Sequence, residues 1–356
     1  DFGNLTQSRW LMGQGAASST RGLFVGGLDP SPSTTFNIID YITMAQTGNA
    51  VDFGDLSTTR RMGSGCQSST RGIFAGGYAS TPTPHTNIIE FVTIATTADA
   101  QDFGDLNYEQ KNGSAASNST RGLFFVGNDG SNPYTNNISF ITIATTGNAV
   151  DFGDATVSAG GGGSSSSPTR AVRGGGLAPG NSNVIDFVEI ATTGNAVDFG
   201  NLSKKVNGGS GNISNSTRGI TSGGYDGDAG ANASHIDYHI FSSNGGAYDF
   251  GDLTEASNAH GGYSNGRTGI FAMGYPTYSG QLTFITIATT GDATAFGSLT
   301  SPPAVADAGG INSPTRAILH QLNNSNENIK MCEFVTFETL GNSQEFGNLS
   351  VARQAG

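Results

Sequence analysis

Charged residues are scarce in this sequence of 356 residues: they make up 12%, and 16 Lys and Arg face 28 Asp and Glu. A net charge of -12 leaves no basic stripe that could displace counterions from a phosphate backbone, so we expect no nucleic-acid partner. The shortage of charge also argues against amphipathic helices, which need charged outer faces. Long helices are therefore not expected.

Cysteine and long apolar runs are also nearly absent. Cys66 and Cys332 occupy non-equivalent positions of the repeat described below, so we expect no disulfide and two small apolar side chains. No run of about 18 apolar residues occurs, so no membrane span is expected. The chain lacks an initiator Met and a signal-peptide pattern and opens inside a motif, so we expect it to be processed or cut from something longer.

Glycine, in contrast, is abundant, with 54 residues, and Ser, Thr and Asn are frequent. This composition is typical of turns and half-buried strands. Aligning the chain with itself reveals Phe-Gly pairs that bound seven intervals of about 50 residues, so the chain repeats one unit. The pairs begin at Phe2, Phe53, Phe103, Phe152, Phe199, Phe250, Phe296 and Phe346.

Each unit contains the same four phrases, for example TTRRMGSGCQSS, TRGIFAGG, NIIEFVTIATT and AQDFGDL. The third phrase alternates as a strand with one buried face does. The TTGNA that follows it in several units predicts a tight hairpin turn into the DFG strand. The first phrase is rich in Gly and Ser, which suits an innermost strand where neighbouring sheets crowd a central axis. Four phrases predict four strands.

A four-stranded antiparallel unit repeated seven times predicts an all-β fold, a seven-bladed β-propeller that forms one domain over residues 1–356. The blades are expected at residues 6–56, 57–106, 107–155, 156–202, 203–253, 254–299 and 300–349. We expect the C-terminal EFGNL to complete the seventh blade. The DFGNL of residues 1–5 is then a surplus copy, either a linker or a competing edge strand.

The Gly-Gly pair after an apolar strand, followed by IIDY or IIEF, resembles the kelch repeat, with DFG near the place of the kelch Trp. The longer phrase STRGLFVGG…NIIDYITMAQTGNAVDFGDL is also similar to repeats of structural proteins of marine bacteriophages, notably cyanophages. This resemblance implies a fibre, tail or capsid-surface protein, located on the virion surface. It implies other virion proteins, or a host receptor or glycan, as partners in a larger assembly.

An arginine and an acid recur in the units, and both are missing from the sixth, where Thr268 and Ala295 replace them. We therefore expect the two side chains to meet within one blade in a charge-assisted hydrogen bond. A ring of arginines that binds an anion is the alternative. The expected pairs are Arg21 with Asp52, Arg71 with Asp102, Arg121 with Asp151, Arg170 with Asp198, Arg218 with Asp249, and Arg316 with Glu345.

Residues with catalytic or metal-binding chemistry are present but scattered. His235 and His239 would share one face of a strand, yet zinc needs two further ligands, so no metal site is expected. The DFGD carboxylates and the Asp-Gly loops at 128–132 and 225–230 could be calcium ligands or simple turns. No nucleophile elbow occurs, and the glycine-rich run from Ser158 lacks the Lys of a phosphate loop. We expect no cofactor and no enzymatic activity.

The loops after the second strands differ most among the units, in length and in chemistry. Because recognition usually resides in loops on a rigid scaffold, we expect a partner to bind there. The aromatic and acidic candidates are Tyr78, His85, Tyr134, Tyr225, Asp226, Asp228, Tyr275 and Tyr278. Three functions remain open: a virion propeller in particle architecture or host attachment, a secreted bacterial carbohydrate-binding or carbohydrate-active propeller, and a kelch-like protein-binding adaptor.

Overall fold

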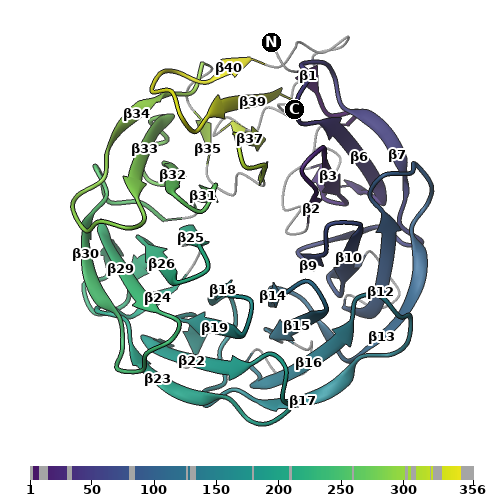
Figure 1. Cartoon of the computed structure of the whole chain (residues 1–356), viewed down its shortest axis with the longest axis horizontal. Coiled ribbons are helices and arrows are strands. Elements are labelled where there is room, and N and C mark those ends of the chain that lie inside the picture. The colour runs from purple at the N-terminus through teal and green to yellow at the C-terminus, as the bar shows by residue number, and fades with distance from the viewer. Residues whose placement is uncertain are drawn as a thin grey trace.

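The computed structural model describes residues 3–7, 15–29, 34–79, 85–125, 127–128, 134–178, 180–207, 211–258, 260–300, 304–305, 310–320, 322–323 and 331–345. The regular elements among them are β-strands. In these ranges no helix is long and apolar enough to cross a membrane. Six four-stranded antiparallel sheets and one five-stranded sheet form a ring, as Figure 1 shows. The predicted all-β propeller is confirmed.

Each sheet forms one blade, with its first strand at the axis and its last at the rim (Figure 1). The inner strands are β2 (Gly15–Ala17), β9 (Ser64–Gln67), β14 (Ser114–Ser117), β18 (Gly163–Ser166), β25 (Gly211–Ser214), β31 (Gly261–Ser264) and β36 (Gly310–Asn312). The second strands are β3 (Arg21–Val25), β10 (Arg71–Ala75), β15 (Arg121–Phe125), β19 (Arg170–Gly174), β26 (Arg218–Ser222), β32 (Thr268–Ala272) and β37 (Arg316–His320).

The two outer strands of each blade follow. The third strands are β6 (Ile38–Thr43), β12 (Thr86–Thr93), β16 (Asn137–Thr142), β22 (Val184–Glu189), β29 (His235–Ile240), β33 (Gln281–Thr286) and β39 (Met331–Thr336). The rim strands are β7 (Val51–Asp55), β13 (Gln101–Gln110), β17 (Val150–Asp154), β23 (Val197–Asn201), β30 (Tyr248–Asp252), β34 (Thr294–Ser298) and β40 (Gln344–Glu345).

The seventh blade takes its rim strand from both ends of the described chain. Strand β40 pairs with Glu333 and Phe334, while β1 (Gly3–Asn4) pairs with Met331 and Cys332 of the same β39. Leu5 is buried in the adjoining core. Strand β1 is thus an edge strand beside the C-terminal copy of the motif, which is one of the two alternatives expected for residues 1–5. Residues 346–349, expected to complete the seventh blade, lie outside the described residues.

The hydrophobic core lies between neighbouring blades. One cluster joins Phe125 and Phe152 of the third blade to Val188 and Ile190 of the fourth, and all four are buried. Similar clusters occur at the other contacts between blades. Burial of this apolar surface is the main stabilising term that holds the ring together.

The glycine of the DFG motif permits close contact between blades. Gly104 has a φ of +140°, and a Cβ there would lie 2.5 Å from the carbonyl carbon of Gly147 in the next hairpin turn. The amide of Gly147 donates to the carbonyl of Phe103 (2.6 Å), and the amide of Asp105 donates to Oδ1 of Asn148 (3.0 Å). The same close approach occurs at Gly54, Gly153, Gly200, Gly251 and Gly297. The motif thus docks one blade onto the next.

Short strands connect the segments on the face that carries the variable loops, which we call the loop face. They are β4 (Leu28–Asp29) with β5 (Thr34–Thr35), β8 (Arg60–Arg61) with β11 (Tyr78–Ala79), β20 (Leu177–Ala178) with β21 (Gly180–Asn181), β24 (Val206–Asn207) with β27 (Tyr225–Asp226) and β28 (Ala231–Asn232), and β35 (Ala304–Val305) with β38 (Leu322–Asn323). The opposite face carries the turns between first and second strands and between third and rim strands, and we call it the turn face.

Candidate functional site

The repeated arginines bridge neighbouring blades, and Arg170 also pairs with an acid of its own blade, Glu189 at 2.6 Å, which is not the predicted Asp198. The guanidinium of Arg71 lies 4.5 Å from the ring centre of Phe91 in its own blade, and its Nη1 donates to the carbonyl of Ile143 in the next blade (2.9 Å). The equivalent bonds join Arg21 to Ile94, Arg121 to Ile190, Arg170 to Phe241, Arg218 to Ile287 and Arg316 to Met44. Arg316 closes the ring onto the first blade.

The predicted acid partners have another role. Asp102 accepts a hydrogen bond from the amide of Gly104, two residues on, and so stabilises the bend of the DFG motif. Asp52, Asp198 and Asp249 do the same in their blades. The predicted pairs of Arg21 with Asp52, Arg71 with Asp102, Arg121 with Asp151, Arg170 with Asp198 and Arg218 with Asp249 are therefore wrong. For Arg316 and Glu345, the side chain of Glu345 lies outside the described residues.

This geometry predicts unequal effects of two substitutions in one repeat. Arg71→Gln removes a charge-assisted hydrogen bond and a cation–π contact across a half-exposed contact between blades, and should lower the free energy of unfolding by about 1–2 kcal/mol. Asp102→Asn retains a side-chain oxygen for Gly104 and should change it by less than about 0.5 kcal/mol. Urea unfolding of both variants measures the difference. If both variants lose the same free energy of unfolding, the predicted ion pair between Arg71 and Asp102 would be supported instead.

Buried carboxylates on the third strands form a second set of links between blades, which we did not predict. Asp186 accepts from the amide and hydroxyl of Thr156, which follows the rim strand of the preceding blade. Burial raises the pKa of Asp186, and it also raises that of the equivalent Asp237. The other amide donors and acceptors are Thr6 with Asp40, Ser57 with Glu90, Ser203 with Asp237 and Thr300 with Glu333. The signal in the sequence is a Ser or Thr after DFG-type strands, followed by an acid in the next unit's third strand.

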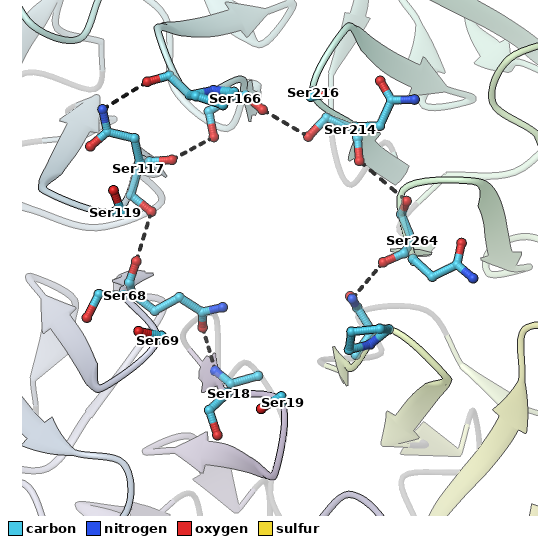
Figure 2. Close-up of a pocket in the computed structure, with 18 of the residues that line it drawn as sticks. Ser18, Ser19, Ser68, Ser69, Ser117, Ser119, Ser166, Ser214, Ser216 and Ser264 are labelled. Atoms are coloured by element: carbon cyan, nitrogen blue, oxygen red, sulfur yellow. Dashed lines mark hydrogen bonds between the residues drawn. The ribbon is translucent and has the colours of Figure 1, made fainter.

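The turn face has a hollow at the axis, the axial basin, with a volume of about 760 Å³ (Figure 2). It is lined by the turns between first and second strands, which contribute Ser, Asn and Gln with Ala17, Pro168 and Pro314. No charged or aromatic side chain is among its described lining residues. Ser18 and its equivalents accept from backbone amides of their own turns. The exposed tips include Ser19, Ser69, Ser119 and Ser216.

Side chains at the floor of the basin connect the inner strands. Ser166 Oγ donates to the carbonyl of Ser117 (2.9 Å), and Asn312 Nδ2 donates to that of Ser264 (2.7 Å). Ser117, Ser214 and Ser264 make the corresponding bonds to Gln67, Ser166 and Ser214 (Figure 2). The basin therefore presents neutral hydroxyl and amide groups on a fixed ring. Such groups suit a neutral polar ligand, because they can donate and accept without a buried charge.

The predicted binding residues of the loop face differ in their accessibility. His85 and Asp226 are buried, with 7% and 4% of their surface exposed. Asp226 accepts from the amides of Asp228 and Ala229 in its own turn, and so it is not available at the surface as we expected. Asp228 is exposed and pairs with Lys205 at 3.0 Å. Tyr134 and Tyr278 are half-buried.

The remaining predicted tyrosines have distinct surroundings. Tyr225 and Tyr275 are exposed, at 38% and 48%, and the ring of Tyr275 lies edge-on to that of Tyr278, with ring centres 5.6 Å apart. Leu177, at the equivalent position of the fourth blade, is 41% exposed. We call Leu177, Tyr225 and Tyr275 the apolar arc, because they follow one another on three consecutive blades. Tyr78 is half-buried between Arg61 and Lys111.

The residues considered for metal chemistry do not converge. No group of three or more His, Cys, Asp or Glu that could hold a metal occurs in the described part of the chain. His239 and His260 are buried, and burial lowers the pKa of each to about 4. Cys66 and Cys332 are buried in separate blades, and burial raises the pKa of Cys66 to about 12.

The ring of antiparallel sheets with two distinct axial faces is a β-propeller. No family model matches the chain, and no curated protein matches it. A solved structure titled "Structure of YjhT" is similar over 82% of this chain and 98% of its own, with a TM-score of 0.61 and 12% sequence identity. At this identity the likeness concerns the fold alone.

Proposed function

We propose that the chain is a non-enzymatic propeller of a bacteriophage virion surface, acting in particle architecture or host attachment through its loop face. The observation that carries the proposal is the apolar arc of Leu177, Tyr225 and Tyr275. Exposed apolar side chains at equivalent positions of three consecutive blades offer repeated contact points on one face, unlike singly scattered ones. Tyrosine is well suited to this role, because its ring buries apolar area while its hydroxyl forms hydrogen bonds.

The difference between the uniform turn face and the variable loop face supports this proposal. The repeated Arg, Gly and carboxylate contacts link the blades to one another, and the turn face repeats nearly the same residues around the ring. The loop face carries different residues in each blade on this fixed scaffold. Recognition commonly resides in such loops. The similarity to repeats of phage structural proteins supports a location on the virion surface, with virion proteins or a host receptor or glycan as partners.

The proposal predicts that Tyr225→Ala, Tyr275→Ala and Tyr278→Ala combined reduce adsorption of particles to host cells, or incorporation of the subunit into particles, by at least tenfold. A matched control is Tyr248→Ala, because Tyr248 is 47% exposed but lies on the rim strand β30. Thermal unfolding confirms that both variants fold. Unchanged adsorption and incorporation in the triple variant would reject the loop face as the recognition surface.

A carbohydrate-binding propeller of a secreted bacterial protein is the second candidate, and the axial basin favours it. Its hydroxyl and amide lining matches the donors and acceptors of a neutral sugar. A glycan array probed with the isolated chain, beside mass spectrometry of purified particles, separates the two candidates. Sugar binding without incorporation into particles would favour the second.

A further inference from the structure

Two basic side chains flank one tyrosine on the loop face. The guanidinium carbon of Arg61 lies 4.8 Å from the ring centre of Tyr78, and Nζ of Lys111 lies 5.1 Å from the same centre. Arg61 pairs with Tyr78 through the backbone of β8 and β11, whereas Lys111 belongs to the linker that enters the next blade. We call these three residues the cationic tyrosine cluster.

In the part of the chain that the structure describes, the charges of this cluster lack acidic partners. Lys204 and Lys205 on the loop face lie 3.7 Å and 3.0 Å from the carboxylates of Asp226 and Asp228. Arg60, next to Arg61 in the chain, pairs with buried Glu90. Among the described residues, neither Arg61 nor Lys111 has a carboxylate within 4 Å of its charged nitrogens. Two half-exposed positive charges without an acidic partner among the described residues thus lie against one ring, in a chain with a net charge of -12.

We propose that the cationic tyrosine cluster binds a carboxylate of an acidic polysaccharide, one rich in uronic acid. This inference rests on the proposed role of the loop face in recognition and names the chemistry of the ligand. Arg61 and Lys111 supply charge-assisted hydrogen bonds to the carboxylate. The Tyr78 hydroxyl, which has no hydrogen bond within the described chain, supplies a further donor. Stacking against the tyrosine holds both long side chains in place, which reduces the entropy lost on binding.

The charge distribution favours isolated carboxylates over a phosphate backbone. Nucleic acids present closely spaced phosphates and are bound by many cations at once. Here only two cations are clustered in a chain with a net charge of -12, so a ligand with one negative charge on every second sugar meets less repulsion than a polyphosphate does. The apolar arc on the following blades lies on the same face, where neutral sugar rings of the same polymer can stack on Tyr225 and Tyr275.

The test uses an array of uronic-acid, sulfated and neutral oligosaccharides, followed by titration calorimetry with a hyaluronan octasaccharide and its carboxyl-reduced counterpart. The whole chain should bind the uronic-acid class, and the carboxyl-reduced probe should bind at least tenfold more weakly. Arg61→Gln combined with Lys111→Gln should weaken binding of the acidic probe at least tenfold. Arg267→Gln, which removes an exposed charge from the turn face, should leave binding unchanged.

A charge-conserving variant separates the role of charge from that of folding. Arg61→Lys combined with Lys111→Arg should keep binding within about threefold of the parent. Equal binding of the acidic and reduced probes, binding confined to sulfated sugars, no binding of the uronic-acid class, or full binding by the double Gln variant would each overturn the inference. Adsorption that depends on Tyr225, Tyr275 and Tyr278 but not on Arg61 and Lys111 would overturn it and leave the proposed function standing.

Discussion

Gly104→Ala should lower the free energy of unfolding by about 3–5 kcal/mol, because the new methyl group meets both a conformational and a steric obstacle. The residue has a φ of +140°, where side chains other than glycine are strained. Its Cβ would also lie 2.5 Å from the carbonyl carbon of Gly147 in the next blade. This neighbour is backbone and is held by the hydrogen bond to Phe103, so it cannot move aside without separating the blades.

A matched control separates these two terms. Gly147 has a φ of +153°, but a Cβ there would meet no atom within 4 Å. Gly147→Ala should therefore cost only the conformational term, about 1–2 kcal/mol. Urea unfolding followed by circular dichroism measures both variants. If Gly104→Ala and Gly147→Ala destabilise the protein equally, close contact between blades is not the reason for the glycine in DFG.

The periodic features of the sequence predicted the fold well. The segment IIEFVTI forms the predicted strand β12, and the Gly- and Ser-rich phrase forms the inner strands where blades crowd together. These features depend on local geometry repeated at a constant interval. The prediction of one buried face is wrong for β12, because Phe91 and Val92 lie in the cores on either side of the blade. The sequence left the role of residues 1–5 open between a linker and an edge strand, because both the N- and the C-terminal copy of the motif can pair with the last third strand. In the structure β1 and β40 share the edge of β39.

The partner of the repeated arginine was predicted wrongly for a related reason. Only the sixth unit lacks both the Arg and the acid. One such case does not show whether the two side chains are in contact or are missing together by chance. The true acceptor of Arg71 is the backbone carbonyl of Ile143. Every residue has such a carbonyl, so the residue types in the sequence do not reveal which one accepts the hydrogen bond. The contacts of the buried carboxylates could have been predicted from the sequence, because residue types like those of Thr156 and Asp186 recur as a pair across most units.

Surface positions in loops were the least predictable. Tyr78, Tyr225 and Tyr275 follow second strands at equivalent places, yet Tyr78 is half-buried between two cations while the other two are exposed. Their surroundings depend on the neighbouring blade, which supplies Lys111 beside Tyr78. The exposure of a loop residue thus depends on its own repeat and on the neighbouring one, so it cannot be predicted from a single repeat.

Acidification from pH 7.5 to pH 5 should lower the free energy of unfolding by about 2 kcal/mol for each of His239 and His260. Burial lowers the pKa of both to about 4 in the folded protein, against 6.5 in the unfolded chain. The unfolded chain therefore binds protons first as the pH falls. The stabilisation is complete above pH 6.5 and is lost as the pH falls from there to about 4. Urea unfolding at the two pH values measures the loss.

The contacts of His260 explain why the folded protein resists protonation. The amide of Gly211 donates to Nε2 of His260 (3.1 Å), so this nitrogen must remain an acceptor. His260→Gln can keep an acceptor in that region but does not titrate, and it should therefore remove about 2 kcal/mol of the loss at pH 5.

Buried Asp186 and Asp237, whose pKa values are raised, change the free energy of unfolding in the opposite direction as the pH falls, because the folded carboxyls bind protons more readily than the unfolded ones. Their contribution is common to parent and variant and cancels in the comparison. An unchanged pH dependence in His260→Gln would contradict the assignment of the loss to this histidine.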